Sequence, residues 1–275
     1  MIIGVVVTHA APAAQLDRCL DALTVAGSLD RVVVVDNGGA AAIGDRDAVD
    51  VVRTDNRGYG AAANEGFSLA AEQGADLVAL LNDDVIVRSS WLAPLVAALD
   101  RDERLGAVQP KLLFADREPT TVNSLGVAVD EYGAGHDLGS GEPDGADDPT
   151  DIEAFTGGAV VFRRSFLEAT GGFDERYFLY YEDVDLSARG RVLGWRYRCI
   201  PTSVVDHIGS ATTAATPERT RFLQERNRLW CTFRNGDRRT IVRATWLSVR
   251  RLRHEPRRVH ATACLLYTSP SPRDI

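Results

Sequence analysis

The chain has 275 residues, 45% of them hydrophobic and 25% charged, which is enough for one large or two small globular domains with a buried core. Its formal net charge of −8 argues against a duplex nucleic-acid binder, and its four separated cysteines form neither a CxxC pair nor a disulfide framework. A disordered chain and a disulfide miniprotein are therefore excluded, and a reducing compartment such as the cytoplasm is expected.

Short β-branched runs alternate with amphipathic segments in the first half of the chain. This alternation predicts strand–helix units in a mostly parallel α/β sheet. We expect strands at residues 2–8, 31–36, 49–53 and 76–81, with helices over residues 14–26 and 60–73. Acidic residues follow two of these strands, as Asp36 and as Asn82-Asp83-Asp84. Ligands of open α/β sheets bind at the carboxyl ends of the strands, so this edge is the expected site.

The middle of the chain is rich in glycine, aspartate and proline from residue 114 to residue 151. This composition predicts a long mobile loop, which is either a lid over a substrate or a plain surface insertion. After it we expect a helix over residues 182–193 and strands at residues 155–162, 195–200 and 203–205.

The character of the chain changes at Pro217. Residues 217–260 hold 13 arginines and four acidic residues, a net charge of +9, whereas residues 1–216 carry −17. We therefore expect a main domain over residues 1–216 and a basic helical segment over residues 217–263. Residues 264–275 resemble the translation of a sequencing adapter, and we expect them not to be part of the natural protein. No apolar stretch approaches the roughly 18 residues of a membrane span, and the short start of the chain lacks the basic region of a secretory leader.

Three segments are candidates for binding a metal or a phosphate. Asn82-Asp83-Asp84 places carboxylates at a strand end, where they suit Mg²⁺ or Mn²⁺, although such a pair is also typical of a turn or a helix cap. Residues 55–66 combine glycines with Arg57 at a helix start, which suits an anion. They also fit the dinucleotide pattern GxGxxA, but after the third strand rather than the first. His207 is either a metal ligand or a structural histidine.

Glu182, Asp183 and Asp185 form a dense acidic cluster at the start of a predicted helix. Mutual repulsion raises the proton affinity of such carboxylates, as a general base requires. Acids in a first helical turn also simply complement the helix dipole, which is the alternative interpretation.

The order of these motifs resembles that of family-2 glycosyltransferases, nearest the bacterial rhamnosyltransferase and galactofuranosyltransferase-like branch. The resemblance covers about residues 2–235. The motifs that carry it are Val7-Thr8-His9, Val35-Asp36-Asn37, Asn56-Arg57-Gly58 through Asn64-Glu65-Gly66, Leu81-Asn82-Asp83-Asp84, Thr156-Gly157-Gly158, Tyr181-Glu182-Asp183-Val184-Asp185 and His207-Ile208-Gly209-Ser210.

The resemblance implies a GT-A fold, which is a Rossmann-like, mostly parallel sheet flanked by helices, followed here by C-terminal helices. It implies an inverting, metal-dependent transfer of a sugar, with rhamnose or galactofuranose favoured. The donor would be a dTDP or UDP sugar, and the acceptor a hydroxyl of a glycan or of a polyprenyl-linked glycan. The expected setting is bacterial cell-wall or polysaccharide biosynthesis.

The resemblance also assigns roles to residues. Asp84 and His207 would hold Mg²⁺ or Mn²⁺, Asp183 would be the base, and Glu182 would contact the acceptor. The acceptor side would include Gly157, Gly158 and Trp195. The nucleotide sugar would be bound by Thr8, His9, Asp36, Asn37, Asn56, Arg57, Gly58, Asn64 and Asp83. Two departures from the family pattern are Asn82, in place of a first aspartate, and His9, where many relatives carry asparagine.

Two other functions remain open at this point. A nucleotidyltransferase would normally show an early glycine-rich loop with arginine and lysine. Residues 8–12 contain no glycine, arginine or lysine, and Lys111 is the only lysine of the chain. An inactive sugar-binding module would have lost Asp183 or Asp84, and both are present. The basic segment is expected to allow peripheral contact with the inner face of the plasma membrane.

Overall fold

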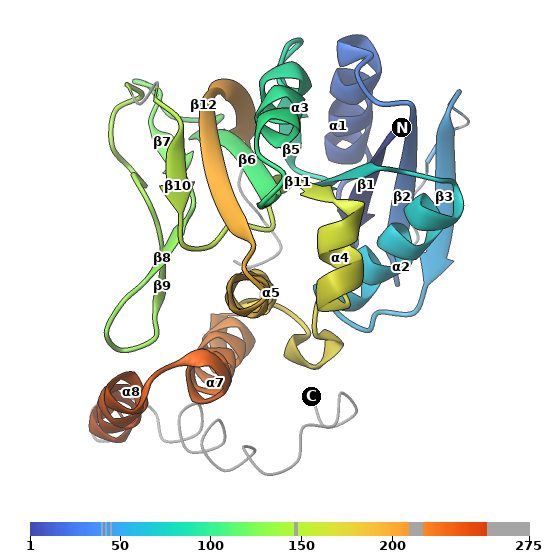
Figure 1. The fold of residues 1–275 in the computed structure, drawn as a ribbon. Coiled ribbons are helices and arrows are strands. Elements are labelled where there is room, and N and C mark those ends of the chain that lie inside the picture. Colours follow the sequence, from blue (N-terminus) through green and yellow to red (C-terminus); the bar gives the residue numbers. More distant parts are fainter. Residues whose placement is uncertain (40, 42, 45, 146–147, 209–216, 252–275) are drawn as a thin grey trace.

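A computed structural model describes residues 1–39, 41, 43–44, 46–145, 148–208 and 217–251 (Figure 1). The helices are α1 (Ala13–Ala26), α2 (Tyr59–Glu72), α3 (Leu92–Arg101), α4 (Arg164–Thr170), α5 (Glu182–Val192), α7 (Pro217–Asn235) and α8 (Arg238–Arg251), with a short 3₁₀ turn η1 (Glu175–Tyr177). The strands are β1 (Ile2–Thr8), β2 (Arg31–Asn37), β3 (Val49–Thr54), β4 (Leu77–Asn82), β5 (Val85–Val87), β6 (Leu105–Phe114), β7 (Val122–Ser124), β8 (Val127–Val129), β9 (Gly135–Asp137), β10 (Thr150–Ile152), β11 (Ala159–Arg163) and β12 (Arg196–His207). Gly209-Ser210, the predicted boundary at residue 216 and the adapter-like tail lie outside the described residues.

Ten strands form one sheet, in which eight follow the order β10-β12-β6-β11-β4-β1-β2-β3. Strands β1 to β4, β6 and β12 run in one direction, while β11 lies antiparallel between β4 and β6. Strand β5 pairs with the end of β12, and β7 pairs with β6. The prediction of a mostly parallel α/β sheet is therefore confirmed.

The sheet is buried on both faces because consecutive side chains of a strand point to opposite sides. Val5 and Val7 of β1 pack with Phe67 of α2 and Phe166 of α4 in one cluster. Val6 packs with residues of α1 and α3 in the other cluster. Figure 1 shows α1 and α3 on one side of the sheet and α2, α4 and α5 on the other.

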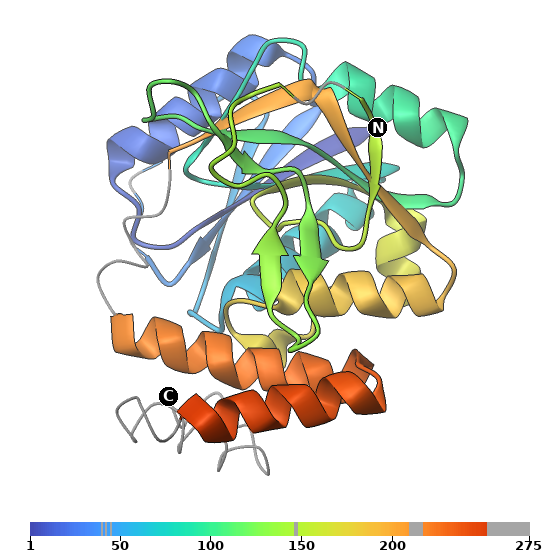
Figure 2. The ribbon, with the colours of Figure 1, turned by 90° about the vertical axis from the view of Figure 1, so that its left-hand side faces the viewer.

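The prediction of a long mobile loop over residues 114–151 is wrong for much of that range. Strands β7 and β10 join the main sheet, and β8 and β9 form a hairpin that extends toward α7 (Figure 2). At the hairpin turn, Gly133 has φ of +73° and a Cβ there would collide with Thr232 of α7. The glycines that suggested mobility therefore permit tight turns and close packing.

Other predicted elements differ mainly at their ends. The strand expected at residues 155–162 is β11, which begins only at Ala159. The strands expected at residues 195–200 and 203–205 are one strand, β12, whose pairing with β6 shifts register between Ile200 and Val204. Within the described residues, no helix combines the length and the apolar character needed to cross a membrane.

Candidate active site

The carboxyl ends of β1, β2 and β4 bring polar side chains to one edge of the sheet, as predicted. Thr8 is in register with Asp36, and Val7 is in register with Asn82. Thr8 and Asp36 are both almost completely buried. The Asp36 carboxylate accepts hydrogen bonds from the backbone N–H groups of Gly39 (3.0 Å) and Ala41 (3.1 Å), so it shapes the loop that follows β2.

A second polar group links β1 to the segment before α2. His9 Nδ1 lies 2.7 Å from the backbone oxygen of Asn37, and His9 Nε2 lies 3.4 Å from Asn56 Nδ2. The Asn37 amide donates to the carbonyl of Gly58 (3.2 Å), and Asn56 Oδ1 accepts from Gly58 N–H (3.1 Å). Since a carbonyl only accepts, His9 carries its proton on Nδ1, and Nε2 is free to accept.

Gly58, Asn64 and Arg57 face the loop that precedes α5. Gly58 has φ of +97°, and a Cβ there would lie 2.4 Å from the carbonyl oxygen of Phe178. The Asn64 amide donates to the carbonyl of Phe173 and accepts from its N–H, both at 2.9 Å. Arg57 lies 3.3 Å from Glu175 and remains about half exposed. Packing thus accounts for Gly58 and Asn64 without a nucleotide, whereas Arg57 keeps a reachable guanidinium.

Asp84 and His207 lie side by side, although 123 positions separate them in the chain. Strand β5 begins directly after Asp84 and pairs with the end of β12, with Val85 opposite His207. His207 Nε2 is 3.2 Å from Asp84 Oδ2. Both side chains are largely buried, and Asp84 Oδ1 has no hydrogen-bond partner among the described residues.

The hydrogen bonds of His207 indicate what this pair can hold. Its Nδ1 lies 3.1 Å from Asn123 Oδ1, which can only accept, so Nδ1 donates, and in the neutral ring Nε2 presents a lone pair toward Asp84. Two electron-pair donors that face each other in a buried site suit a cation between them. No third His, Cys, Asp or Glu completes a metal-binding group within the described part of the chain. Mg²⁺ or Mn²⁺ would therefore need oxygens from substrate or water as well, as Mg²⁺ commonly does.

Asp83 lies beside this pair but has its own partners. Its Oδ1 accepts from Gln15 Nε2 of α1 at 3.0 Å. Burial raises the pKa of Asp83, partly offset by the hydrogen bond from Gln15. The carboxylate is thus engaged with α1.

The segment Thr156-Gly157-Gly158 connects the metal edge with the acidic pair at the start of α5. The carbonyl of Gly158 accepts from the backbone N–H of Asn82 at 3.0 Å. The N–H of Gly157 donates to Asp183 Oδ2 at 3.0 Å, and its carbonyl accepts from the Tyr59 hydroxyl at 2.7 Å. One short segment therefore positions Asn82-Asp83-Asp84 relative to Asp183.

Glu182, which is buried, and Asp183, which is partly buried, form a carboxyl pair. Burial raises the pKa of both groups, and the charge of Asp183 raises the pKa of Glu182 further. Hydrogen bonds from the N–H groups of Gly157 and Val184 partly counter this for Asp183, whereas Glu182 Oε2 has no hydrogen-bond partner within the part of the chain that the structure describes. Asp183 is thus the acid of the pair that loses its proton more readily.

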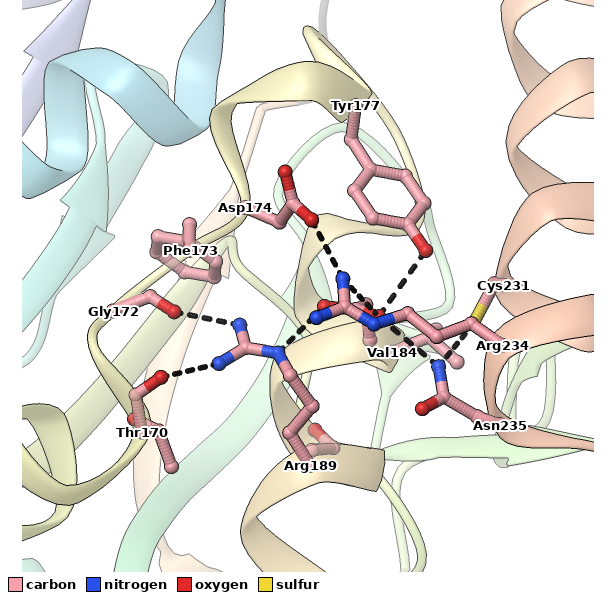
Figure 3. Close-up of polar contacts among 12 residues, drawn as sticks. Thr170, Gly172, Phe173, Asp174, Tyr177, Val184, Arg189, Cys231, Arg234 and Asn235 are labelled. Carbon is pink, nitrogen blue, oxygen red and sulfur yellow. Dashed lines mark hydrogen bonds and ion pairs between the residues drawn. The ribbon is translucent and has the colours of Figure 1, made fainter. Parts of the chain in front are cut away.

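Asp185 does not belong to this acidic pair, contrary to the sequence interpretation. It is fully buried and is held by Arg189 Nε (2.8 Å), Asn235 Nδ2 (3.0 Å) and the Tyr177 hydroxyl (3.2 Å). Figure 3 shows Arg189 reaching the carbonyls of Thr170 and Gly172 from the same site. The carboxylate therefore ties α5 to α7 and does not repel Asp183 in the way predicted.

The loop before Glu182 has an unusual backbone that α7 supports. Phe178, Tyr180 and Tyr181 have φ of +66°, +71° and +70°, a region that costs bulky side chains about 1–3 kcal/mol each. The Asn227 amide, fully buried, donates to the carbonyls of Tyr177 (2.9 Å), Leu179 (2.8 Å) and Tyr180 (2.8 Å). Helix α7 is thus part of the support for the acidic pair.

A cavity of about 870 Å³ opens beside Asp183. Its wall is formed by the β8–β9 hairpin, the start of α5, Thr156, the loop residues Tyr180 and Tyr181, and residues of α7 and α8. The charged side chains in the wall are Asp137, Asp183, Arg221, Glu225, Arg228 and Arg251. Sequence reasoning missed Asp137 and the arginines, because only the packing of the hairpin and the two helices brings them to Asp183.

The sequence analysis assigns Trp195 to the acceptor side, but the structure places it elsewhere. It directly precedes β12, whereas His207 ends that strand; Leu105 and Phe114, the β6 partners of the two ends of β12, are nine residues apart, roughly 30 Å at about 3.3 Å per residue. Its ring packs edge-on against Phe166 with 5.8 Å between centroids. It therefore belongs to the opposite edge of the sheet and not to an acceptor site.

Known proteins are similar to this chain in sequence and in fold. The family model described as glycosyltransferase-like family 2 matches residues 2–232. The O-antigen biosynthesis protein RfbC of Myxococcus xanthus is 38% identical over 144 residues, which is 50% of this chain and 11% of that protein. N-acetylglucosaminyl-diphospho-decaprenol L-rhamnosyltransferase of Mycobacterium tuberculosis is 42% identical over 62 residues, which is 22% of this chain and 20% of that protein.

The matched parts thus cover at most a fifth of these two relatives. Among solved structures, that of GalNAc-T7 with UDP, GalNAc and Mn²⁺ is similar with a TM-score of 0.61 and 17% identity. The similarity covers 82% of this chain and 47% of that one. At this identity the likeness concerns the fold.

Proposed function

Because the chain belongs to the family-2 glycosyltransferases and has a GT-A-like fold, we propose that it transfers a sugar from a nucleoside diphosphate to an acceptor hydroxyl in one inverting step. The observation that carries this proposal is the Thr156-Gly157-Gly158 segment, which joins the Asp84–His207 pair to Asp183. A cation-binding pair and a candidate base are thus held at a fixed separation, with the cavity beside the base.

The donor would bind along the edge of the sheet. We assign the nucleotide to Thr8, His9, Asp36 and the segment Asn56-Arg57-Gly58, with Asn37 and Asp83 supporting that edge. Asn64 is left out because its amide is already paired with Phe173. Asp84 and His207 would hold Mg²⁺ or Mn²⁺, which when bound supplies a Lewis acid for the leaving diphosphate.

Asp183 would accept the proton of the attacking hydroxyl. Its raised pKa suits a general base that works near neutral pH, and its carboxylate lines the cavity in which an acceptor fits. The N–H groups of Gly157 and Val184 orient both of its oxygens. Attack from the face opposite the diphosphate then inverts the anomeric carbon in one displacement. Glu182, which keeps its proton to higher pH, would hydrogen-bond the acceptor.

The cavity wall favours an acceptor that carries phosphate. Arg221 lies in the same wall as Asp183, together with Arg251, which is 2.9 Å from Glu225; guanidinium groups suit phosphate oxygens. We therefore propose a polyprenyl-diphosphate-linked glycan, consistent with the name of the mycobacterial relative. A dTDP-rhamnose or UDP-galactofuranose donor and work at the inner face of the plasma membrane complete the proposal.

A donor panel tests this function. The purified chain is incubated with dTDP-rhamnose, UDP-galactofuranose, UDP-glucose or UDP-GlcNAc and Mg²⁺ or Mn²⁺, and release of nucleoside diphosphate is measured with and without a glycan acceptor. We expect release from one donor class, inhibition by EDTA and recovery with excess metal. Formation of pyrophosphate from a sugar phosphate and a nucleoside triphosphate would instead support a nucleotidyltransferase. Binding of a sugar nucleotide without turnover under all conditions would support an inactive binding module.

A further inference from the structure

Helix α8 exposes an apolar stripe. Val242, Trp246 and Val249 are 67%, 54% and 48% exposed, and their spacing of four and three residues places them along one side of the helix. At about 100° per residue this side lies opposite Ala244 and Ser248, which are buried. In Figure 2 α8 lies below α7, at the margin of the described structure. The outward face of α8 is therefore apolar.

Arginines flank this stripe. Helix α8 contains five arginines and no acidic residue. By the same helical rotation, Arg238 lies on one side of the stripe and Arg239, Arg243 and Arg250 lie on the other. The Arg250 guanidinium is 5.4 Å from the centre of the Trp246 ring. An exposed tryptophan and valines bordered by arginines are typical of helices that lie in a membrane interface.

We propose that α8 docks on the surface of an anionic lipid bilayer, with Val242, Trp246 and Val249 inserted among the lipids. Lipid phosphates complement the four flanking arginines, because no carboxylate on α8 opposes them. Arg243 is 2.8 Å from Glu131 of the hairpin, so the Glu131 carboxylate partly neutralises the charge of Arg243. Arg238, Arg239 and Arg250 are the arginines expected to contribute most.

Docking in this way would hold the active-site cavity on the far side of α8 from the lipid, about one helix diameter, roughly 10 Å, above the bilayer surface. Arg251 at the end of α8 lines the same cavity as Asp183. By the same helical rotation Arg251 faces away from the stripe, so an acceptor whose lipid part stays in the membrane would reach the cavity past the end of α8. Delivery of a membrane-anchored acceptor rests on the proposed function. Vesicle binding is measured without donor, metal or acceptor, so membrane docking and sugar transfer can each fail independently of the other.

Vesicle flotation with matched valine and tryptophan variants tests the apolar stripe. The chain is mixed with vesicles of phosphatidylcholine alone or of an equimolar phosphatidylcholine–phosphatidylglycerol mixture. We expect binding to the anionic vesicles only, reduced about tenfold by Trp246→Ser and clearly by Val242→Ser. Val25→Ser and Val192→Ser are the controls, since these valines are 82% and 87% exposed on other helices. Equal loss in the control variants, or none in Trp246→Ser, would overturn the proposal.

The charge contribution is tested separately. Arg239→Ser and Arg250→Ser should each weaken partitioning roughly fivefold, and added salt should reduce this effect. Arg18→Ser and Arg101→Ser, on α1 and α3, should leave it unchanged. Anionic vesicles should also shift Trp emission to the blue in the unmodified chain but not in Trp246→Phe. Gel filtration identifies a different occupant: an oligomer that dissociates in Trp246→Ser would show a second copy on this face and would overturn the proposal.

Discussion

The backbone N–H of Gly157 donates a 3.0 Å hydrogen bond to Asp183 Oδ2. The next residue, Gly158, accepts from the N–H of Asn82, which begins the acidic segment containing Asp84. The separation between the proposed base and the proposed metal ligands is thus set by one stretch of backbone. Each end of this arrangement can be altered by substitution without cutting the connection.

Replacing Asp183 with asparagine should remove the base and retain the shape of the side chain. We expect kcat to fall by about 10²–10⁴, the usual contribution of a positioned general base, while donor affinity changes little. Steady-state transfer rates and a donor titration without acceptor measure the two quantities. Glu168→Gln on the exposed surface of α4 is the control. Undiminished turnover in Asp183→Asn would contradict the assignment.

Metal binding should depend on Asp84 and His207 together. We expect Mn²⁺ with a nucleoside diphosphate to raise the Tm of the unmodified chain, because a ligand that binds only the folded state stabilises it. The shift should disappear in Asp84→Asn and His207→Ala. Asn123→Ala, which frees the His207 ring, should weaken apparent metal affinity by about 10–100-fold. A shift of unchanged size in Asp84→Asn would refute this site.

The buried acidic pair should make stability depend on pH. The native pKa of Glu182 is raised above its unfolded value, so the folded chain binds more protons in the interval between the two values. Stability therefore falls as pH rises through that interval. Glu182→Gln cannot ionise, so its Tm should fall less between about pH 5 and 8, by several °C, because each pH unit inside this interval is worth up to about 1.4 kcal/mol. Differential scanning fluorimetry across this range measures the change.

Asp174 is the opposite case to Glu182, because its pKa is lowered in the folded chain and not raised. Burial alone would raise the pKa of Asp174, but hydrogen bonds from Arg176 and Arg234 outweigh it and lower the pKa to about 2. Its stabilising effect is complete above the ordinary aspartate pKa and is lost as pH falls toward 2. Asp174→Asn should therefore lower Tm throughout the neutral range without flattening its dependence on pH. An identical flattening in both variants would show that the Glu182 effect is not specific.

Much of the fold could be predicted because its signals are local. The β-branched runs at β1 and β2 and the periodic leucines of α1 identify a parallel α/β sheet, and the acids after β2 and β4 indicate its binding edge. The pairing of Asp84 with His207 could be expected only from the family resemblance. It depends on the contact between β5 and β12, which no spacing within the chain reveals.

The errors arose where a residue type has several structural uses. Glycines that suggested a mobile loop form the turns of a packed hairpin, as at Gly133. Closeness in sequence suggests that Asp185 acts with Asp183, yet residues two apart on a helix do not share a face. The supporting role of Asn227 could not be predicted, because its partners lie about 50 positions earlier in the chain.

Gly58 and Gly171 form a matched pair for testing backbone packing. Both have positive φ, at +97° and +74°, but a Cβ at Gly58 would meet the backbone of Phe178 whereas one at Gly171 would meet nothing within 4 Å. Gly171→Ala should cost about 1 kcal/mol from backbone strain alone. Gly58→Ala should cost clearly more, about 2–4 kcal/mol, because the loop before Glu182 must also move. Urea unfolding of both variants measures the difference, and equal losses would contradict this account.

Asn227 should hold Glu182 and Asp183 in position through its hydrogen bonds to the loop before α5. Asn227→Asp is nearly isosteric, but it cannot donate to the carbonyls of Tyr177, Leu179 and Tyr180. We expect a loss of about 2–4 kcal/mol in unfolding free energy, since buried carbonyls lose their partners beside residues of positive φ. Asn235→Ala on the same helix removes a bond to Asp185 instead and should cost about 1 kcal/mol.

The pH dependence of transfer separates positioning by Asn227 from simple stabilisation. If the loop relaxes, Asp183 becomes more hydrated and its pKa falls toward the ordinary aspartate value near 4. The acidic limb of the kcat profile should then move to lower pH in Asn227→Asp, and kcat should fall with little change in donor affinity. Asn235→Ala should leave that limb in place because Asp185 does not face the cavity. An unshifted limb in Asn227→Asp, measured well below its Tm, would show that Asn227 supports the fold without positioning the base.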